Sequence, residues 1–520
     1  MLISSLLSGV LYFLSFPPFG YWYLIFPALF IFYISILPTK KEKTTNISIG
    51  PGVHGFIFGS IAYGVILFGI QSIGLEAWIP LTILMGLMYG FFAKVFSYFG
   101  IKTSNNYFVL VGLVSVFDLL RAYFPFGGFP WGYPSTVLVG DITKNFYRAY
   151  GPIGFSLVVE SLVLLLVLFL FTKNKDSGLF NFVYLRYFLV FFLIFGFTFF
   201  QEFAVREISR DVEVSIIQGN SPCPGAKNRC ENERQRIYES HLNLTKSLNV
   251  DTSIQDESTQ RLIIWAESSS GFGNDPGINP KTLEEISNEA KRLNSSFLIG
   301  GDRPVDSNYF ENYGIFINEN GKITGEYLKQ HPVPFGEYIP FRRYLDWIPP
   351  LSLVPRDMIR GDGQKIFSLG EKSIKISSVI SFEGSFERYI RRSVQDGAEL
   401  IVILTNQASY GESGMSEQFI LMSRANALSN HRDVVHAAIT GKSAFISGVD
   451  GKVYSTTELF TRDILTNLIT AYDDITTYSV WGNYLNYIMI AVGFIIYSFR
   501  KTKTSTWNNQ HIQNHAFEQL

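Results

Sequence analysis

The fold is decided by the stretch Ile376-Ser377-Ser378-Val379-Ile380-Ser381-Phe382-Glu383-Gly384-Ser385-Phe386. β-Branched residues in its first half predict a buried strand, and Glu383 with Gly384 predicts a turn into a helix. Such a strand-to-helix elbow exposes one side chain, here Ser381, and directs nearby backbone N–H groups toward it. The pattern therefore predicts an α/β domain with a candidate nucleophile at the elbow.

The residues around this elbow, from about 205 to 475, have the pattern of a soluble α/β domain. Strands are expected at 211–218, 261–267, 297–301, 313–317, 400–406, 434–440 and 443–449. Helices are expected at 229–250, 281–293, 388–394 and 415–431, and the stretch 268–273 is expected to be a loop. Strands alternate with helices in places and form hairpins elsewhere, which predicts mixed sheets covered by helices in a layered sandwich.

The chain has 520 residues, too many for one ordinary domain, and its first 200 residues are almost wholly apolar. Segments that approach the roughly 20 residues of a spanning helix lie at 2–15, 22–38, 54–72, 79–100, 107–123, 152–172, 184–200 and 483–499. This pattern predicts a polytopic α-helical membrane bundle of about eight spanning helices that carries the α/β domain. The net charge of −1 argues against a nucleic-acid partner.

The positive charges predict the orientation of this bundle, because cytoplasmic loops carry an excess of Lys and Arg. With the N-terminus in the cytoplasm, the cytoplasmic side receives Lys40, Lys41, Lys43, Lys102, Lys173, Lys175, Arg186, Arg500, Lys501 and Lys503. The first segment has no basic start and no cleavage pattern, so we expect a retained helix. The expected divisions are a transmembrane bundle at 1–203, a periplasmic domain at 204–480, a transmembrane helix at 481–500 and a cytoplasmic polar tail at 501–520.

Two features leave alternatives open. The connection 121–133 is rich in aromatic residues, Pro and Gly, which suits either a belt at the headgroup level or a floor where a lipid tail enters. Cys223 and Cys230 either form a disulfide in an oxidising compartment or remain two unpaired thiols. Two cysteines are too few for a disulfide scaffold or a zinc site of their own.

Two further side chains are candidates for chemistry with the elbow. Glu267 ends the apolar strand pattern 261–267, where burial would raise the pKa of its carboxyl and make it a competent base. Lys329 lies among aromatic and apolar residues, where it could hold a fixed positive charge over a developing oxyanion. The alternatives are a solvated glutamate and a surface lysine before a proline-rich loop. His331 is a lesser candidate, because it precedes Pro332 in an extended stretch.

Taken together, these motifs resemble a known superfamily. Trp265-x-Glu267, then Tyr327-x-Lys329-x-His331-x-Val333-Pro334-Phe335-Gly336-Glu337, then the elbow with Phe382-Glu383, are similar to the nitrilase superfamily. The flanking apolar segments narrow the resemblance to the bacterial apolipoprotein N-acyltransferases. It extends to 16–22, 128–131 and 218–220, and so covers nearly the whole chain.

The resemblance implies an αββα sandwich and a two-step acyl transfer. A phospholipid donates an acyl chain to the nucleophile, and the S-diacylglyceryl cysteine at the N-terminus of an apolipoprotein then accepts it on its α-amino group. Glu267 matches the general base, Lys329 the oxyanion stabiliser, and Ser381 the position of the nucleophilic cysteine. Glu337, Glu383 and Phe382 match residues that bind or orient this site. No metal or cofactor is implied, and we expect a monomer embedded in the bacterial inner membrane.

The chain departs from the family pattern at its centre. Ser381 replaces the cysteine, Phe382 replaces a tyrosine, Ser409 a tryptophan, and Ile439-Thr440 an asparagine-containing pair. A serine hydroxyl is a weaker nucleophile than a thiol, so we predict weak or absent N-acyltransferase activity. Three hypotheses follow: an N-acyltransferase, a non-catalytic paralogue that binds lipid or lipoprotein, and a membrane-tethered amidase or nitrilase-type hydrolase.

Overall fold

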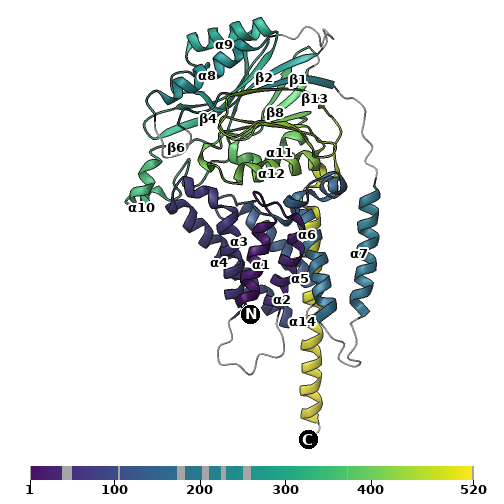
Figure 1. Ribbon diagram of the computed structural model, residues 1–520. Helices are drawn as coiled ribbons and strands as arrows, with labels where there is room; N and C mark the ends of the chain where they lie inside the picture. Colours follow the sequence, from purple (N-terminus) through teal and green to yellow (C-terminus); the bar gives the residue numbers. More distant parts are fainter. Residues whose placement is uncertain are drawn as a thin grey trace.

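A computed structural model describes residues 2–37, 50–102, 106–171, 182–201, 210–223, 230–249, 259–371 and 373–517. The chain forms an α/β domain, at the top of Figure 1, that sits on a bundle of helices. Leu2 and the end of the last helix both lie on the side of the bundle away from the α/β domain.

Two β-sheets form the centre of the α/β domain. The larger sheet has the strand order β13-β1-β2-β3-β4-β5, with β6 paired to β4, and the smaller has the order β12-β11-β10-β9-β8-β7. In both sheets the central strands are parallel and the outer strands antiparallel. The strands are β1 Arg210–Gln218, β2 Gln260–Gly271, β3 Ser296–Pro304, β4 Tyr309–Ile317, β5 Ile323–Leu328, β6 Asp357–Met358, β7 Ile366–Leu369, β8 Ile374–Ile380, β9 Leu400–Thr405, β10 Val434–Ala438, β11 Ala444–Ile446, β12 Val453–Thr456 and β13 Asp463–Ala471.

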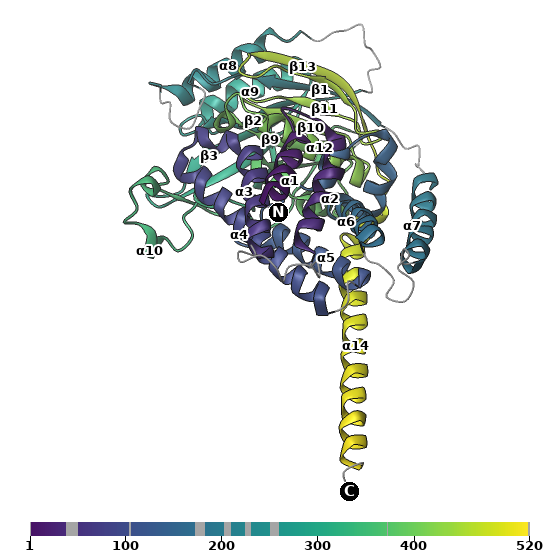
Figure 2. The same ribbon diagram turned by 60° about the horizontal axis from the view of Figure 1, so that its bottom comes forward.

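Helices cover the outer face of each sheet and complete an αββα sandwich (Figures 1 and 2). α8 and α9 pack on the larger sheet, and α11 and α12 on the smaller one. The inner faces of the two sheets form an apolar core of their own. The helices from α8 to α13 are α8 Glu233–Ser247, α9 Pro280–Leu293, α10 Arg342–Leu345, α11 Glu387–Gln395, α12 Met415–Asn430 and α13 Thr477–Trp481. The predicted layered sandwich is confirmed.

The apolar segments form the helices of the bundle. They are α1 Leu2–Leu14, α2 Ile25–Ile36, α3 Pro51–Ile66, α4 Leu75–Lys102, α5 Tyr107–Tyr123, α6 Lys144–Phe171, α7 Phe182–Phe200 and α14 Tyr484–Phe517. In the described part of the chain, two helical stretches, Leu75–Gly100 and Asp141–Phe171, are long and apolar enough to cross a membrane. The apolar stretches of the other helices are shorter, at 10–17 residues, among them Tyr184–Phe200 of α7 and Tyr484–Arg500 of α14. The eight predicted segments are thus helical, but eight membrane spans are not confirmed.

One glutamine ties the bundle to the α/β domain. Gln418 of α12 accepts a hydrogen bond from the indole N–H of Trp131 (2.6 Å) and donates to the carbonyl oxygens of Pro17 (2.8 Å) and Ile66 (3.2 Å). Pro17 and Trp131 lie in two separate connections of the bundle, and Ile66 is the last residue of α3. α12 is therefore buried between the smaller sheet on one side and the bundle on the other, and it shares one apolar core with both.

The aromatic connection 121–133 forms part of this junction. Trp131 and Tyr133 are each 2% exposed, so neither a headgroup belt nor a lipid floor describes them. Phe124 is 61% and Phe126 38% exposed, so these two rings are accessible in the way that the sequence predicts for a lipid-facing surface.

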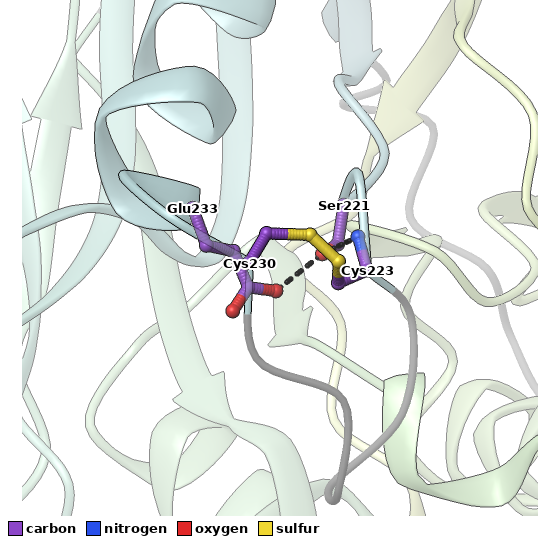
Figure 3. The surroundings of a disulfide bond; sticks show 4 residues. All are labelled: Ser221, Cys223, Cys230 and Glu233. Atoms are coloured by element: carbon purple, nitrogen blue, oxygen red, sulfur yellow. Dashed lines mark hydrogen bonds between the residues drawn. A yellow bond between two sulfur atoms is a disulfide. The ribbon is translucent and has the colours of Figure 1, made fainter.

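A disulfide joins Cys223 and Cys230, with Cα atoms 5.9 Å apart, and resolves the alternative that the sequence left open. Figure 3 shows it beside Ser221, whose hydroxyl donates to the Glu233 carboxylate (2.5 Å) and accepts from the backbone N–H of Cys223. The bridge therefore ties the end of β1 to the start of α8.

One sequence expectation needs correction, the structure adds helix to the segment predicted as a polar tail, and one expectation lies outside the described residues. β2 continues to Gly271 instead of ending at Glu267, because Ser270 and Gly271 pair with Gly301 and Asp302 of β3 after an irregularity in the register. α14 continues beyond residue 500, where a polar tail was predicted. The loop charges Lys40, Lys41, Lys43, Lys173 and Lys175 lie outside the described residues.

Candidate active site

The elbow has the predicted shape, with a tight turn between the strand and the helix. β8 ends at Ile380, the 3₁₀ turn η6 covers Ser381–Ser385, and α11 begins at Glu387. Ser381 has φ = 52°, in the left-handed region. For a residue with a Cβ this conformation costs roughly 1–2 kcal/mol, and such strain tends to occur at functional sites. Ser381 is half-buried, so its hydroxyl remains within reach of a substrate.

Glu383 holds the elbow in place. Its carboxylate accepts four hydrogen bonds: from the backbone N–H groups of Gln330 (2.5 Å), His331 (2.9 Å) and Ile380 (2.8 Å), and from the Tyr327 hydroxyl (2.8 Å). Burial raises the pKa of Glu383 above its usual value, while these hydrogen bonds oppose the shift. Because three of the partners can only donate, the geometry suits the ionised carboxylate. Glu383 thus fastens the elbow to the segment that follows β5.

Glu267 lies beside the elbow, 5% exposed. It accepts hydrogen bonds from the Asn312 side-chain amide (2.8 Å) and the backbone N–H of Asn406 (3.0 Å), and the Ser381 side chain lies near enough to lower its pKa. Burial raises the pKa of its carboxyl, although the Lys329 charge and the side chains of Asn312 and Ser381 oppose the shift. A carboxylate with a raised pKa beside the serine is placed to act as a general base.

Lys329 is fully buried between two carboxylates. Its ammonium lies 2.6 Å from Glu337 Oε1 and 3.5 Å from Glu267 Oε1. Burial alone would lower the pKa of Lys329, but the charges of Glu337 and Glu267 outweigh burial and hold the pKa above its usual value. Among the described residues these are the two acceptors of the ammonium, which leaves one N–H for a substrate oxygen.

The structure therefore brings Glu267, Lys329, Ser381 and Glu337 together, and it places Glu383 behind the turn. The solvated-glutamate and surface-lysine alternatives do not describe Glu267 and Lys329, which are both buried. Phe382 is 9% exposed and packs against Phe129, Phe386 and His331 with ring centroids 4.8–6.1 Å apart. It lines the apolar side of the elbow.

His331 does not join the reacting groups. One ring nitrogen, Nδ1, lies 3.0 Å from the Tyr389 hydroxyl. Burial, aided by the charges of Arg388 and Arg360, lowers the pKa of His331 to about 3. It is therefore a neutral packing residue beside the site.

Sequence reasoning missed two residues that hold the base. The side-chain amide of Asn312, in β4, donates to Glu267, and the backbone carbonyl oxygen of Asn312 accepts a hydrogen bond from the backbone N–H of Lys329 (2.9 Å). Asn406 supplies a backbone N–H to Glu267, and the Thr440 hydroxyl donates to the carbonyl of Asn406 (3.0 Å). The signal at Asn312 was a polar residue directly before the apolar strand run 313–317. A backbone donor such as Asn406 leaves no trace in residue type.

This arrangement suits acyl transfer, with a base, a cation and a nucleophile in one cluster. In the described ranges, no three His, Cys, Asp or Glu side chains form a candidate metal site. The αββα fold with a Glu, a Lys and an elbow nucleophile defines a protein of the carbon-nitrogen hydrolase class. Residues 215–473 match the family described as Carbon-nitrogen hydrolase.

The comparisons define the family more closely. Residues 8–165 match the family described as Apolipoprotein N-acyltransferase N-terminal domain. Similar proteins, each named apolipoprotein N-acyltransferase, occur in Aquifex aeolicus (25% identity, covering 89% of this chain and 97% of that protein) and Geobacter metallireducens (24%, 95% and 94%). The relative from Mycolicibacterium smegmatis is 28% identical over 55% of this chain, which spans about half of that protein (48%). The chain belongs to the apolipoprotein N-acyltransferase family.

Solved structures of the nitrilase superfamily resemble the α/β domain only distantly. An amidase from Nesterenkonia sp. (12% identity, TM-score 0.34) covers 53% of this chain and 95% of its own length. Saccharomyces cerevisiae Nit3 (15%, 0.36) covers 51% and 92%. At these TM-scores the likeness carries no argument about the site.

Proposed function

We propose that this chain N-acylates the N-terminal S-diacylglyceryl cysteine of apolipoproteins with a phospholipid as donor, and that Ser381 is the nucleophile. One observation carries this: the side chain of Ser381 lies close enough to the buried Glu267 carboxylate to lower its pKa, and the buried Lys329 ammonium lies 3.5 Å from the same carboxylate. A non-catalytic paralogue would have no reason to keep this cluster aligned. The relatives, which are all named as enzymes, do not favour that alternative either.

In the first step, Glu267 takes the proton of Ser381 while the oxygen attacks the acyl ester carbonyl. Lys329 donates its remaining N–H to the oxyanion. The tetrahedral intermediate collapses, Glu267 returns the proton to the departing glycerol oxygen, and a lysophospholipid leaves. In the second step, the α-amine attacks the acyl-serine ester, Glu267 accepts an amine proton, and the same base returns it to Ser381. No metal or cofactor is needed for these steps.

The helical bundle supports a membrane setting for this chemistry. The residues of α7 that face away from α6 are strongly exposed, with Leu193 at 73%, Phe197 at 72% and Phe200 at 79%, and the helix stands apart in Figures 1 and 2. So much exposed apolar surface needs a lipid surrounding. We propose a multi-pass protein of the inner membrane, with spans in 1–203 and 481–500, domain 204–480 in the periplasm and segment 501–520 in the cytoplasm. We propose that it acts as a monomer.

The test is acyl transfer by the purified chain. A fluorescent phosphatidylglycerol and a synthetic S-diacylglyceryl peptide would be supplied together, and the N-acylated peptide measured by mass spectrometry. We expect slow transfer by the wild-type chain and none by Ser381→Ala or Glu267→Gln. Transfer by Ser381→Ala at the wild-type rate would exclude the serine as nucleophile. The absence of both an acyl-enzyme and product in the wild-type chain would favour the binding paralogue.

A further inference from the structure

An arginine without a carboxylate partner lies beside the catalytic lysine. The segment that carries Arg360 is held by three backbone hydrogen bonds: from Met358 N–H to the Glu337 carbonyl (2.8 Å), from Ile359 N–H to the Phe310 carbonyl (2.8 Å), and from Gly361 N–H to the Lys329 carbonyl (2.9 Å). The approach is close, since a Cβ on Gly361 would lie 2.2 Å from the Leu328 carbonyl oxygen. The backbone of Arg360 is therefore fixed next to that of Lys329.

The Arg360 side chain is exposed, and its guanidinium carbon lies 5.5 Å from the centre of the Tyr338 ring. Among the described residues it has no carboxylate within ion-pair distance, whereas Arg303 has three and Arg342 has two. Arg360 is thus an exposed cation whose backbone is held beside Lys329, with donors available for a ligand.

A second arginine adds positive charge at the same place. Arg388 donates to the carbonyl oxygens of Ala122 and Gly127 (both 2.8 Å) and stacks on Phe386. In the part of the chain that the structure describes, it too has no carboxylate within ion-pair distance. The guanidinium carbon of Arg388 lies 4.4 Å from the centre of the Phe386 ring, and the centroid of that ring lies 4.3 Å from that of His331. His331 is two residues along the chain from Lys329, whose backbone carbonyl accepts from the residue after Arg360. In agreement with this placement, the charges of both arginines lower the pKa of His331.

An apolar surface adjoins the two cations. Phe126, Phe335 and Phe341 are 38%, 44% and 70% exposed, and the Phe126 ring lies 5.8 Å from that of Phe335 and 6.3 Å from that of Phe341. Phe335 belongs to the same loop as Tyr338, the residue under Arg360. A ligand that suits both features is amphiphilic, with an anionic group and an apolar chain.

We propose that Arg360 binds the phosphodiester of the glycerophospholipid donor, with Arg388 adding positive charge and the exposed phenylalanines receiving apolar chain. Arginine matches phosphate oxygens with two parallel N–H groups, and a site with no carboxylate partner does not have to break an ion pair first. The inference rests on the proposed function, because it names the part of that donor which the site selects. It makes Arg360 a specificity-determining residue: a phosphate-bearing lipid is retained and a neutral diglyceride is not.

The test is equilibrium binding to the full-length chain in neutral detergent, using lipids with ether-linked chains that cannot be cleaved. Ether-linked phosphatidylglycerol is compared with the diglyceride of the same chains. Arg360→Gln should weaken binding of the phospholipid about tenfold or more and leave the diglyceride unchanged, as expected for losing a charge-assisted contact. Arg360→Lys should lose less. The matched control is Arg356→Gln, which removes a nearby arginine that faces Phe272.

Equal losses for both lipids, or a loss below twofold for the phospholipid, would overturn the assignment. Inorganic phosphate, at ionic strength matched with sodium chloride, should compete poorly because it lacks the chains. Competition by phosphate as strong as that by the phospholipid would overturn a lipid site. Because these lipids are not cleaved, the result is separable from the proposed function. Selective binding of the phospholipid without turnover of an ester donor would refute the proposed acyltransferase function but support the phosphodiester site at Arg360. Turnover that is unchanged in Arg360→Gln would support the acyltransferase function and refute the site.

Discussion

Glu383 allows the sharpest prediction from the structure. In Glu383→Gln, an NH₂ group must replace one of the two oxygens that accept hydrogen bonds. If the NH₂ group faced Gln330 and His331, it would oppose two backbone N–H groups, neither of which can become an acceptor. The NH₂ group should therefore face Ile380 and Tyr327, because the Tyr327 hydroxyl can rotate and accept from it. One buried backbone donor is then left unpaired, at about 1–3 kcal/mol.

The remaining hydrogen bonds also lose the charge that strengthens them, so the whole change should cost about 3 kcal/mol. At roughly 2–4 °C per kcal/mol, the unfolding midpoint should fall by about 6–12 °C. Tyr327→Phe removes a single neutral donor to Glu383 and should lower the midpoint by about 2–4 °C. The control is Glu371→Gln, an exposed carboxylate in the turn before β8, where we expect a change within about 0.5 kcal/mol.

The assay is intrinsic fluorescence during heating in detergent, together with acyl transfer at 25 °C. Because Glu383 orients the turn that carries Ser381, kcat should fall about 100-fold, as a displacement near 1 Å can do. A midpoint within about 2 °C of wild type and an unchanged kcat would refute the reasoning. A lowered midpoint with an unchanged kcat would mean that Glu383 stabilises the fold without positioning the nucleophile.

Three further predictions concern the base, the nucleophile and the disulfide. Because the pKa of Glu267 is raised, kcat/KM should fall with decreasing pH below a limb that lies above the usual glutamate range; Asn312→Ala removes a donor that lowers this pKa and should move the limb to higher pH. Because the pKa of Glu267 is higher in the folded state than in the unfolded state, its ionisation lowers the free energy of unfolding as pH rises. As pH falls through this limb, the loss of kcat/KM should therefore occur without a fall in the unfolding midpoint. Ser381→Cys should raise transfer about tenfold or more and give a hydroxylamine-labile acyl-enzyme, measured by mass spectrometry, and no gain would contradict an intact site. Replacing Cys223 and Cys230 by serine opens a loop of sequence separation 7 and should cost about 2.5 kcal/mol of unfolding free energy, compared with wild type under oxidising and reducing conditions.

Much of the site could be predicted because its residues have local signatures. Ser381 follows the strand β8, Lys329 follows β5, and Glu267 follows the apolar run 262–266 within β2, while the family resemblance supplied their roles. The layered sandwich followed from the alternation of strands and helices. Ser268–Gly271 was expected as a loop from its serine and glycine content, but pairing with β3 overrides that local preference.

What the sequence could not provide depends on contacts between distant segments. Asn312 and Asn406 hold Glu267 from 45 and 139 residues away, and one of them acts through its backbone. Trp131 looked like an interfacial aromatic because Trp favours that level in membranes, yet its indole reaches Gln418, 287 residues along the chain. Residue types alone carry no information about such pairings.

The position of Gln418 also has a consequence for the timing of folding. It bonds Pro17, Ile66 and Trp131 across 401, 352 and 287 residues, so the connections of the first helices stay without their partner until the chain is almost complete. Contacts at such separation form late, after the loop-closure entropy has been overcome. The upper surface of the bundle should therefore remain open during synthesis and close only when α12 docks on it. A chain that ends before α12 should be degraded by proteases, even though the apolar helices α1 to α7 are already formed.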